Sequence, residues 1–366
     1  MGLNSLKNRT HIIPPAFGLD ISDTSFKAMQ LVPKGKYYRV AAFGEADIGD
    51  GIVEEGKIIQ PDKLRDILKK ELVKYKNLSR YVVASLPDEE VYLKTLKIPH
   101  LQGKELKNAV RVEAERNMPI QADETYFDYA ISEMHEDTDH LHAHVAATKK
   151  EIVDVYIDTL SSAGFIPAII EPEVTAIARS ALTDGRADKG MIVIEIGANR
   201  TRLIAVIKES IALTGSVNFS AKEASEKIAE ALGVSPEKAG KIRWEERMLE
   251  DPKYGSKIEQ GLAPAYDRIA EAIHSYMGFL NEHLKEEGGS VKNIEKLIVS
   301  GGGARLPGIA KQLSMLIQKP VERVNPWINV LPQPLNEIPE LDYADSIRYT
   351  TSIGLALRGA SDNLID

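Results

Sequence analysis

The chain has 366 residues, no cysteine and a formal net charge of −8 at pH 7. This length exceeds one ordinary compact core, so two domains or lobes are expected, and 43% apolar with 27% charged residues is typical of a globular protein. The lack of cysteine excludes disulfides and thiolate metal sites or nucleophiles, and the acidic balance argues against nucleic acid as a main partner.

The first part of the chain predicts an α/β unit. Three strand-like runs precede a helix that begins at Pro61 and carries apolar residues at helical spacing, and another strand follows it. The predicted strands cover 17–21, 25–33, 38–48 and 81–86.

Residues 87–149 interrupt this α/β pattern and predict an inserted subdomain of β-α-β-β order. Its strands are expected at 91–99, 125–134 and 140–148, its charged helix at 101–117, and the α/β texture resumes with a helix over 150–163. His140, His142 and His144 alternate along the last strand and therefore share one face. A zinc site is one reading of this pattern, and the polar face of a half-buried strand is the favoured one.

The second half of the chain repeats the pattern of the first. An apolar strand at 191–197 and two strands at 201–207 and 211–219 match the arrangement at 17–48, which indicates an internal duplication. The remaining elements are helices at 220–232 and 236–249, a long helix to about 285, a strand at 296–300, a helix at 308–317, a strand at 320–324 and a last helix at 344–358.

Each copy of the duplicated pattern ends a strand in a carboxylate, followed by a tight turn of small and hydroxyl residues. The two segments run from Asp20 to Lys27 and from Glu195 to Thr201. Such turns present backbone N–H groups and hydroxyls to an anion, and a carboxylate can hold Mg²⁺ through water. The alternative is that both segments are ordinary solvated turns. Because the same turn occurs in both copies of the duplicated pattern, phosphate binding is favoured.

A third turn follows the predicted strand at 296–300. Gly301, Gly302 and Gly303 lie between that strand and the next helix. Three glycines allow a phosphate or a flat ligand to approach the backbone closely. An ordinary strand–glycine–helix turn is the alternative, and the run of three glycines disfavours it.

Five motifs in this order resemble the actin, sugar-kinase and heat-shock-70 ATPase superfamily. The spacing of Asp20 and Lys27 resembles its first phosphate loop, and Glu195–Thr201 resembles its second. The remaining matches are Glu171-Pro172 with Ala176-Ile-Ala178 for the first connecting helix, Ser300-Gly-Gly with Pro307-Gly-Ile309 for the adenosine motif, and Thr351–Ala356 for the second connecting helix. The implied fold is α/β, with two duplicated lobes on mixed five-stranded sheets around a nucleotide cleft.

The resemblance also implies a site for ATP and Mg²⁺. It assigns the metal to Asp20, Glu171 and Glu195, and the catalytic role beside the attacking water to Glu171 and Glu195. The nucleotide contacts that it implies are Ser22, Thr24, Ser25, Lys27, Gly197, Ala198, Asn199, Thr201, Arg243, Gly301, Gly302 and Gly303. Ser22 replaces the usual glycine of the first loop and Glu195 the usual aspartate of the second, so at most slow ATP hydrolysis is expected.

Within the superfamily the chain resembles the PilM-type type IV pilus assembly proteins. The insert at 87–149 occupies the place of the subdomain shared by PilM and the division protein FtsA. Three segments look like PilM sequence: Ser85-Leu-Pro87 with Leu96-Lys-Ile-Pro99, Ala146-Ala-Thr-Lys-Lys150, and Ala163-Gly-Phe-Ile-Pro167. The polar, acidic C-terminus is unlike the amphipathic tail of FtsA.

This resemblance implies an ATP-binding scaffold of a type IV pilus or related secretion machine, at the inner face of the cytoplasmic membrane. Its partner would be the N-terminal cytoplasmic peptide of a bitopic inner-membrane protein of PilN type, held in a groove between lobe 1 and the insert. Without a secretory signal or an apolar run of the ~18 residues that a span needs, direct membrane insertion is not expected.

Two other functions stay open at this point. One is an FtsA-like or bacterial actin-like protein that polymerises with ATP, so self-association is left open. The other, a small-molecule kinase, requires an aspartate base in a sugar pocket, and the sequence offers no such motif. The expected division is 1–15 as an N-terminal extension, 16–86 and 150–186 as lobe 1, 87–149 as the insert, 187–219 and 295–366 as lobe 2, and 220–294 as its helical insert.

Overall fold

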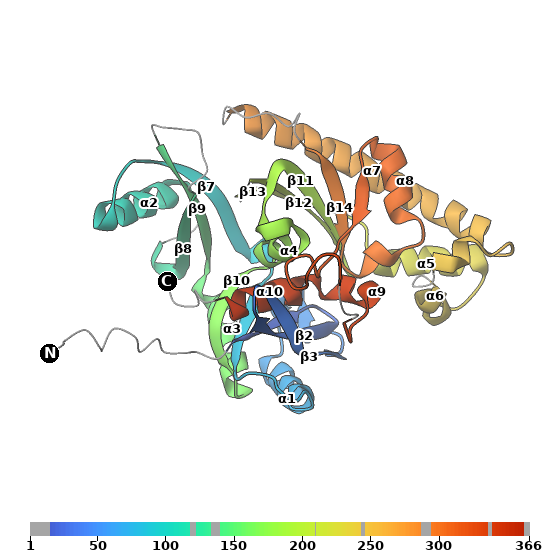
Figure 1. Cartoon of the computed structure of the whole chain (residues 1–366), viewed down its shortest axis with the longest axis horizontal. Coiled ribbons are helices and arrows are strands. Elements are labelled where there is room, and N and C mark those ends of the chain that lie inside the picture. The colour runs from blue at the N-terminus through green and yellow to red at the C-terminus, as the bar shows by residue number, and fades with distance from the viewer. Residues whose placement is uncertain are drawn as a thin grey trace.

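The computed structural model describes residues 15–117, 122–132, 140–208, 210–242, 246–286, 294–335 and 339–361. Within them the chain forms two five-stranded sheets, a three-stranded sheet and a short two-stranded ribbon of β4 (Val53–Glu54) and β5 (Lys57–Ile58). The two large sheets belong to two lobes, and the three-stranded sheet is a separate sheet at the upper left of Figure 1.

The first sheet has the strand order β10-β6-β1-β2-β3. Its central strand is parallel to β6 and antiparallel to β2, and all five of its residues are buried, as expected where both faces are covered. The strands are β1 (Phe17–Ile21), β2 (Ser25–Lys34), β3 (Tyr37–Asp47), β6 (Tyr81–Leu86) and β10 (Ile166–Pro172). Of these, β10 was not predicted from the sequence.

The second sheet repeats this design in the order β13-β12-β11-β14-β15. Its central strand is again antiparallel to the next strand and parallel to a strand from later in the chain. The strands are β11 (Ala187–Ile196), β12 (Thr201–Lys208), β13 (Ser210–Val217), β14 (Lys296–Ser300) and β15 (Val321–Arg323). The predicted fold of two duplicated lobes on mixed five-stranded sheets is therefore confirmed.

The three-stranded sheet is built from the inserted segment, in the order β7-β9-β8. Apolar residues of β7 and β9 pack against Val110 and Ala114 of the helix that covers one face. The elements are β7 (Val91–Pro99), α2 (Gly103–Asn117), β8 (Thr125–Ser132) and β9 (His140–Lys149), which is the predicted β-α-β-β order.

The histidine-bearing face of β9 looks away from α2. His144 lies between the inserted sheet and the second lobe, with Nδ1 2.9 Å from Thr95 Oγ1 and Nε2 2.8 Å from Ser210 Oγ. His142 is buried and His140 is exposed. Through His144 this face packs the subdomain against the second lobe.

Helices cover the outer faces of both large sheets. Leu64, Leu68 and Leu72 of α1, one helical turn apart, are buried under the first sheet, and a proline begins that helix. Ser220 caps α5 by accepting a hydrogen bond from Glu223 N, and Gly233 ends it in the left-handed conformation. These helices are α1 (Pro61–Leu72) and α3 (Lys150–Ser162) on lobe 1, and α5 (Ala221–Leu232), α6 (Pro236–Ile242), α7 (Gly255–Glu286) and α8 (Ile309–Ile317) on lobe 2.

Two helices cross between the lobes, α4 (Glu173–Ala181) and α10 (Thr350–Ala360), the latter preceded by the short α9 (Tyr343–Ser346). They touch at Gly354, where a Cβ atom would lie 1.9 Å from the Ala176 carbonyl oxygen. The sequence-based division placed 295–366 in lobe 2, but α10 packs on the first sheet, because Gly18 of β1 gives it room. Figure 1 shows both helices at the centre of the molecule.

Alternation along β1 sets the direction of the residues that matter for the site. Phe17, Leu19 and Ile21 face α1 and α3, whereas Gly18 faces α10. Asp20 is two residues after Gly18 and therefore points toward the space between the lobes.

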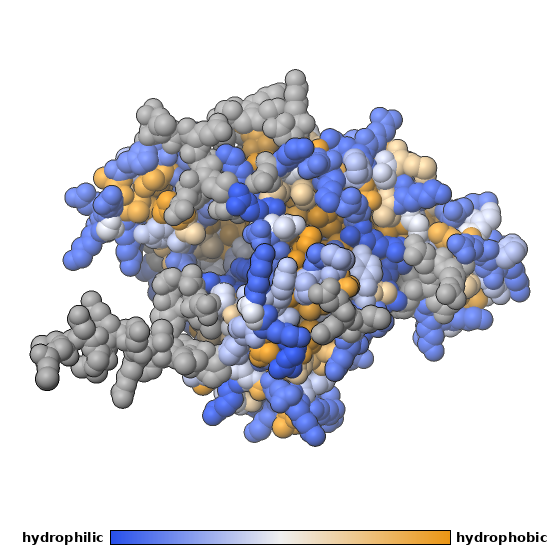
Figure 2. All heavy atoms as spheres, viewed as in Figure 1, coloured by the Kyte–Doolittle hydropathy of each residue, from blue (hydrophilic) through white to orange (hydrophobic). Residues whose placement is uncertain are grey.

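The face of the molecule drawn in Figure 2 is mainly hydrophilic. Figure 2 shows blue residues over most of this face, including much of the length of α7 and α1. Within the described part of the chain, no helix combines the length and apolarity that a membrane span requires.

Candidate functional site

The first predicted phosphate turn begins at the carboxyl end of β1. The turn is closed by the Ser22 amide, which donates to the Ser25 carbonyl oxygen at 2.9 Å. Lys27 lies opposite Asp20 in the β1–β2 register, and its Nζ is 3.4 Å from Ser25 Oγ. Burial raises the pKa of Asp20, while the positive charges of Lys27 and Arg202 act to lower it.

The second predicted turn joins β11 to β12 in the same way. The Gly197 amide donates to the Arg200 carbonyl oxygen at 2.8 Å. The carbonyls of Gly197 and Ala198 accept from the first amides of α5, at 3.0 Å from Ala221 and 3.2 Å from Lys222. Helix α5 therefore holds this turn against the second lobe.

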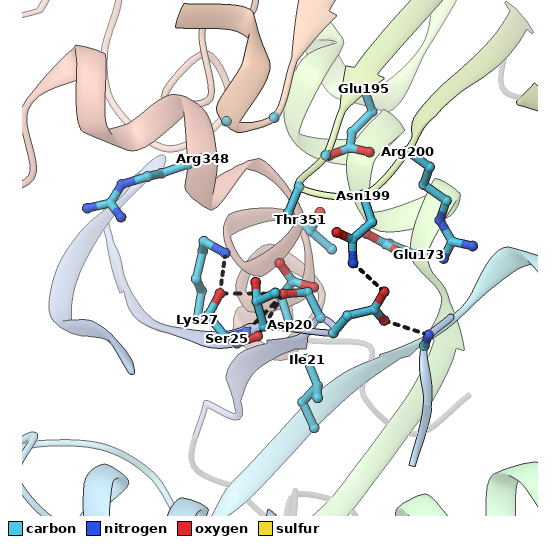
Figure 3. Close-up of a pocket in the computed structure, with 18 of the residues that line it drawn as sticks. Asp20, Ile21, Ser25, Lys27, Glu173, Glu195, Asn199, Arg200, Arg348 and Thr351 are labelled. Atoms are coloured by element: carbon cyan, nitrogen blue, oxygen red, sulfur yellow. Dashed lines mark hydrogen bonds between the residues drawn. The ribbon is translucent and has the colours of Figure 1, made fainter. Parts of the chain in front are cut away.

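The two turns face each other across a cleft. Asn199 Nδ2 donates to Asp23 Oδ2 at 2.7 Å, and Asp23 Oδ1 accepts from the Gly56 amide at 2.9 Å. Figure 3 shows Lys27, Ser25 and Asp20 on one side of this cleft and Asn199 and Glu195 on the other. A cavity of about 260 Å³ lies between them.

The glycine turn after β14 forms a third wall. Gly301 has φ of 75°, and a Cβ atom there would lie 2.5 Å from Glu195 Oε1, so only glycine fits. Gly302 lines the cleft beside it. At Gly303 a Cβ atom would meet the Ile196 side chain at 2.0 Å, so this glycine serves packing under the second sheet.

The structure brings most of the predicted residues together. Those that line the cleft are Asp20, Ser22, Thr24, Ser25, Lys27, Glu195, Gly197, Ala198, Asn199, Gly301 and Gly302. Gly303 and Thr201 do not line it, since the buried Thr201 hydroxyl donates to the Phe219 carbonyl oxygen at 2.9 Å. Arg243 lies outside the described residues.

Glu171 also lies outside the cleft, which corrects the role predicted for it. It forms two hydrogen bonds with Arg179, of 2.6 and 2.8 Å. Because β10 ends at Pro172 and α4 begins at Glu173, it is Glu173 that enters the cleft.

Arg202 is a further cleft residue that was not predicted from the sequence. Its side chain is 11% exposed, with Nη1 2.9 Å from Glu195 Oε2 and Nη2 2.7 Å from Glu173 Oε2. Nε lies 3.3 Å from Asp88 Oδ2. A hairpin that turns at 197–200 pairs Glu195 with Arg202, so the predicted strand register was enough to place Arg202 beside Glu195.

The magnesium ligands predicted from the sequence do not come together as a set. Glu171 is bonded to Arg179, Glu195 is bonded to Arg202, and of the three only Asp20 and Glu195 line the cleft. Among the residues that the structure describes, no trio of Asp, Glu or His could hold a metal ion. The carboxylates of Glu195 and Glu173 instead hold the Arg202 guanidinium, which occupies oxygens that direct ligation of Mg²⁺ would need.

A second hollow of about 440 Å³ lies between the inserted subdomain and lobe 1. It is bounded by the outer strand of each sheet, β8 and β10, and by Val153 and Ile157 of α3. Its other residues are mainly apolar: Leu86, Val91, Tyr126, Phe127, Asp128, Ala146, Ala147, Thr148, Pro167, Ala168, Ile169, Ile170 and Pro172. We call this hollow the subdomain groove.

Comparisons with known proteins agree with this architecture. Residues 18–360 match the model of the family described as type IV pilus assembly protein PilM. The chain is also similar to the structure of a PilM-PilN type IV pilus biogenesis complex, at 25% identity and a TM-score of 0.72 over 95% of this chain and 99% of the other.

More distant similarities concern the fold. The structure of MreB 5 of Spiroplasma citri bound to AMPPNP is 13% identical, with a TM-score of 0.51 over 94% of this chain and 96% of the other. Cell division protein FtsA of Escherichia coli K12 is 21% identical over 205 residues, which are 50% of this chain and 47% of that protein. The chain thus spans about half the length of the curated relatives it matches. These similarities confirm the predicted actin-like ATPase fold.

Proposed function

Because the chain belongs to the type IV pilus assembly protein PilM family, we propose that it is a nucleotide-binding scaffold for a membrane-anchored partner. Its cleft binds ATP or ADP. Its subdomain groove binds the N-terminal segment of a bitopic inner-membrane protein of PilN type. The observation that carries the proposal is the apolar groove between two outer strands, beside the inserted subdomain.

Three turns of the cleft support nucleotide binding. Two of them end strands of the duplicated sheets, and their hydroxyls and amides are of the kind that bind phosphate. Lys27 supplies a positive charge beside Ser25, and Gly301 leaves its backbone open to a close ligand. A protein of the same fold, MreB 5 of Spiroplasma citri, has AMPPNP bound.

The subdomain groove suits an extended peptide. Each outer strand has one edge that can take up another strand, and apolar side chains along the hollow can receive alternate residues of the peptide. Pro167 and Pro172 lack amide hydrogens in β10, so β8 offers the better edge. The structure of a PilM-PilN complex shares the fold over 95% of this chain.

The charge of the groove favours a basic segment. Asp128 lines it, and Asp154 lies beside it, where it accepts a hydrogen bond of 3.0 Å from Tyr126. Cytoplasmic segments next to a membrane span carry an excess of lysine and arginine. We therefore place the protein at the inner face of the cytoplasmic membrane through its partner.

A pull-down with the neighbouring bitopic protein tests this function. The full chain is compared with a version in which a short linker replaces 91–148, so that Asp88 and Glu89 remain beside the cleft. Capture by the full chain alone, with ATP binding kept in both, is expected. Equal capture by both versions, or ATP-dependent sedimentation of filaments without the partner, would support the cytoskeletal alternative instead.

A further inference from the structure

A buried arginine stands among the carboxylates at the phosphate end of the cleft. Arg202 contacts Glu195 at 2.9 Å, Glu173 at 2.7 Å and Asp88 at 3.3 Å. Nη1 and Nη2 both contact Glu173, Nη1 also contacts Glu195, and Nε faces Asp88. The partners come from three separate segments: the end of β11, the start of α4, and the short helix that precedes β7.

This placement follows from the backbone. Arg202 and Glu195 are direct partners in the antiparallel register of β12 and β11. Side chains in such a pair lie on the same face of the sheet, so the guanidinium is fixed beside the Glu195 carboxylate. Arg202 also lines the cleft together with Lys27 and Asn199.

The guanidinium is the charge that these acids share. Burial raises the pKa of Asp20, Asp88, Glu173 and Glu195, and for each of them the positive charge of Arg202 acts in the opposite direction. Burial alone would lower the pKa of Arg202, but Glu173, Glu195 and Asp88 raise it. The guanidinium therefore stays charged at every physiological pH.

A divalent ion bound directly by Glu173 or Glu195 would have to share carboxylate oxygens with Arg202. It would also bring two positive charges next to a fixed one, which is unfavourable at short range. A guanidinium offers five N–H donors, which match phosphate oxygens as well as carboxylates.

We propose that Arg202 supplies, in place of a divalent metal, the positive charge at the phosphate end of this cleft, so that the nucleotide binds without Mg²⁺. The inference rests on the proposed nucleotide site and deepens it. The Arg202 guanidinium offsets part of the negative charge of Glu173 and Glu195, while Lys27 and the turn amides contact the phosphates. Without a metal in the cleft, no metal ion orients and activates an attacking water, which agrees with slow hydrolysis.

Calorimetry of ADP and ATP binding to the full chain, in excess MgCl₂ and in excess EDTA, tests the inference. The wild-type affinity is expected to change less than about threefold between the two conditions, well within about 1 kcal/mol. Arg202→Ala frees Glu173 and Glu195, so its affinity should fall about tenfold or more when EDTA replaces Mg²⁺. Arg200→Ala is the matched control, because Arg200 lines the same cleft but pairs with Glu89. The nucleotide affinity of Arg200→Ala should differ from that of the wild type by the same factor in MgCl₂ and in EDTA.

A second measurement covers the case in which Arg202→Ala is too unstable to test. The double variant Arg202→Ala with Glu173→Gln removes one of the charges left unpaired. Thermal unfolding without nucleotide should then show stabilisation by Mg²⁺ or Mn²⁺ in the Arg202 variants and none in the wild type. Wild-type nucleotide binding that occurs only with Mg²⁺ would overturn this inference alone. An absence of nucleotide binding in both conditions would overturn the proposed nucleotide site, and this inference with it.

Discussion

The side chain of Asn199 joins the two phosphate turns by donating a hydrogen bond of 2.7 Å to Asp23. Asn199 belongs to the second lobe and Asp23 to the first lobe, so this hydrogen bond spans the mouth of the cleft. Asp23 is fixed in turn by the Gly56 amide at 2.9 Å. The contact therefore couples the relative position of the lobes to two side chains that a nucleotide would meet.

Asn199→Asp is expected to hold the lobes apart. It replaces a donor by a second negative charge, and two like charges at hydrogen-bond distance repel. Hydrogen exchange of the amides in 22–25 and 197–201 should accelerate. The reversed pair, Asp23→Asn with Asn199→Asp, restores a donor and an acceptor and should recover protection. Unchanged exchange in the single variant would show that this bond does not hold the cleft.

Lys27→Ala should weaken binding of ATP and ADP about tenfold or more, because a hydrogen bond to a charged group contributes about 1.5–3 kcal/mol. Lys27 lines the cleft beside Ser25. Lys36→Ala is the control, since Lys36 lies in the turn at the far end of β2, over the Tyr37 ring. Calorimetry that finds the same loss for both variants would contradict a specific phosphate contact.

ATP hydrolysis by the wild type should be slow, and Glu195→Asp should leave it slow or raise it. The Glu195 carboxylate is held by Arg202 at 2.9 Å, and a misplacement of about 1 Å can reduce a rate on the order of a hundredfold. Phosphate release under single-turnover conditions measures this. A fast wild-type ATPase that Glu195→Asp disables would mean that the glutamate is already in its productive position.

The contribution of Asp88 to stability should fall as pH rises from about 4 to about 6. Burial raises the pKa of Asp88 from 3.8 to about 6, against the opposing charge of Arg202 and the Val174 amide, with smaller effects of Glu89 and Arg200. The folded chain therefore holds this proton more tightly than the unfolded chain, so the free energy of unfolding decreases as the pH passes through that window.

Asp88→Asn should flatten this pH dependence. The amide oxygen can still accept from Val174 N, as Asp88 Oδ1 does at 3.1 Å, while the titrating group is gone. Urea unfolding of the variant, with the exposed-site variant Asp50→Asn as control, measures the change. An unaltered slope in Asp88→Asn would assign the effect to the other buried acids.

The sequence predicted the fold well because the fold depends on repeated local patterns. Two copies of a strand ending in a carboxylate and a small-residue turn were enough to identify the duplicated lobes. The strand β10 was missed because it contains two prolines and only a short apolar run. The return of α10 to the first sheet depends on close contacts at Gly18 and Gly354, which no local pattern reveals.

The site was predicted less completely, because the sequence does not show which side chains point into the cleft. Glu171 and Glu173 are two positions apart, and only the start of α4 decides which one enters the cleft. Thr201 matches a phosphate-binding pattern, yet its hydroxyl turns inward to Phe219. Arg202 was overlooked because the motif ends at Thr201, although the hairpin register already set it opposite Glu195.

Calorimetric titration of the full chain with a synthetic peptide, the N-terminal cytoplasmic segment of the bitopic partner, tests the scaffold function most directly. The wild type should bind with moderate affinity, as expected when a disordered segment orders on binding. Ile157→Glu, in the subdomain groove, should reduce affinity about tenfold or more. Val73→Glu, at an exposed apolar position just after α1, should bind like the wild type. Equal affinity of Ile157→Glu and the wild type, or binding of the purified protein to lipid vesicles without any peptide, would contradict the account.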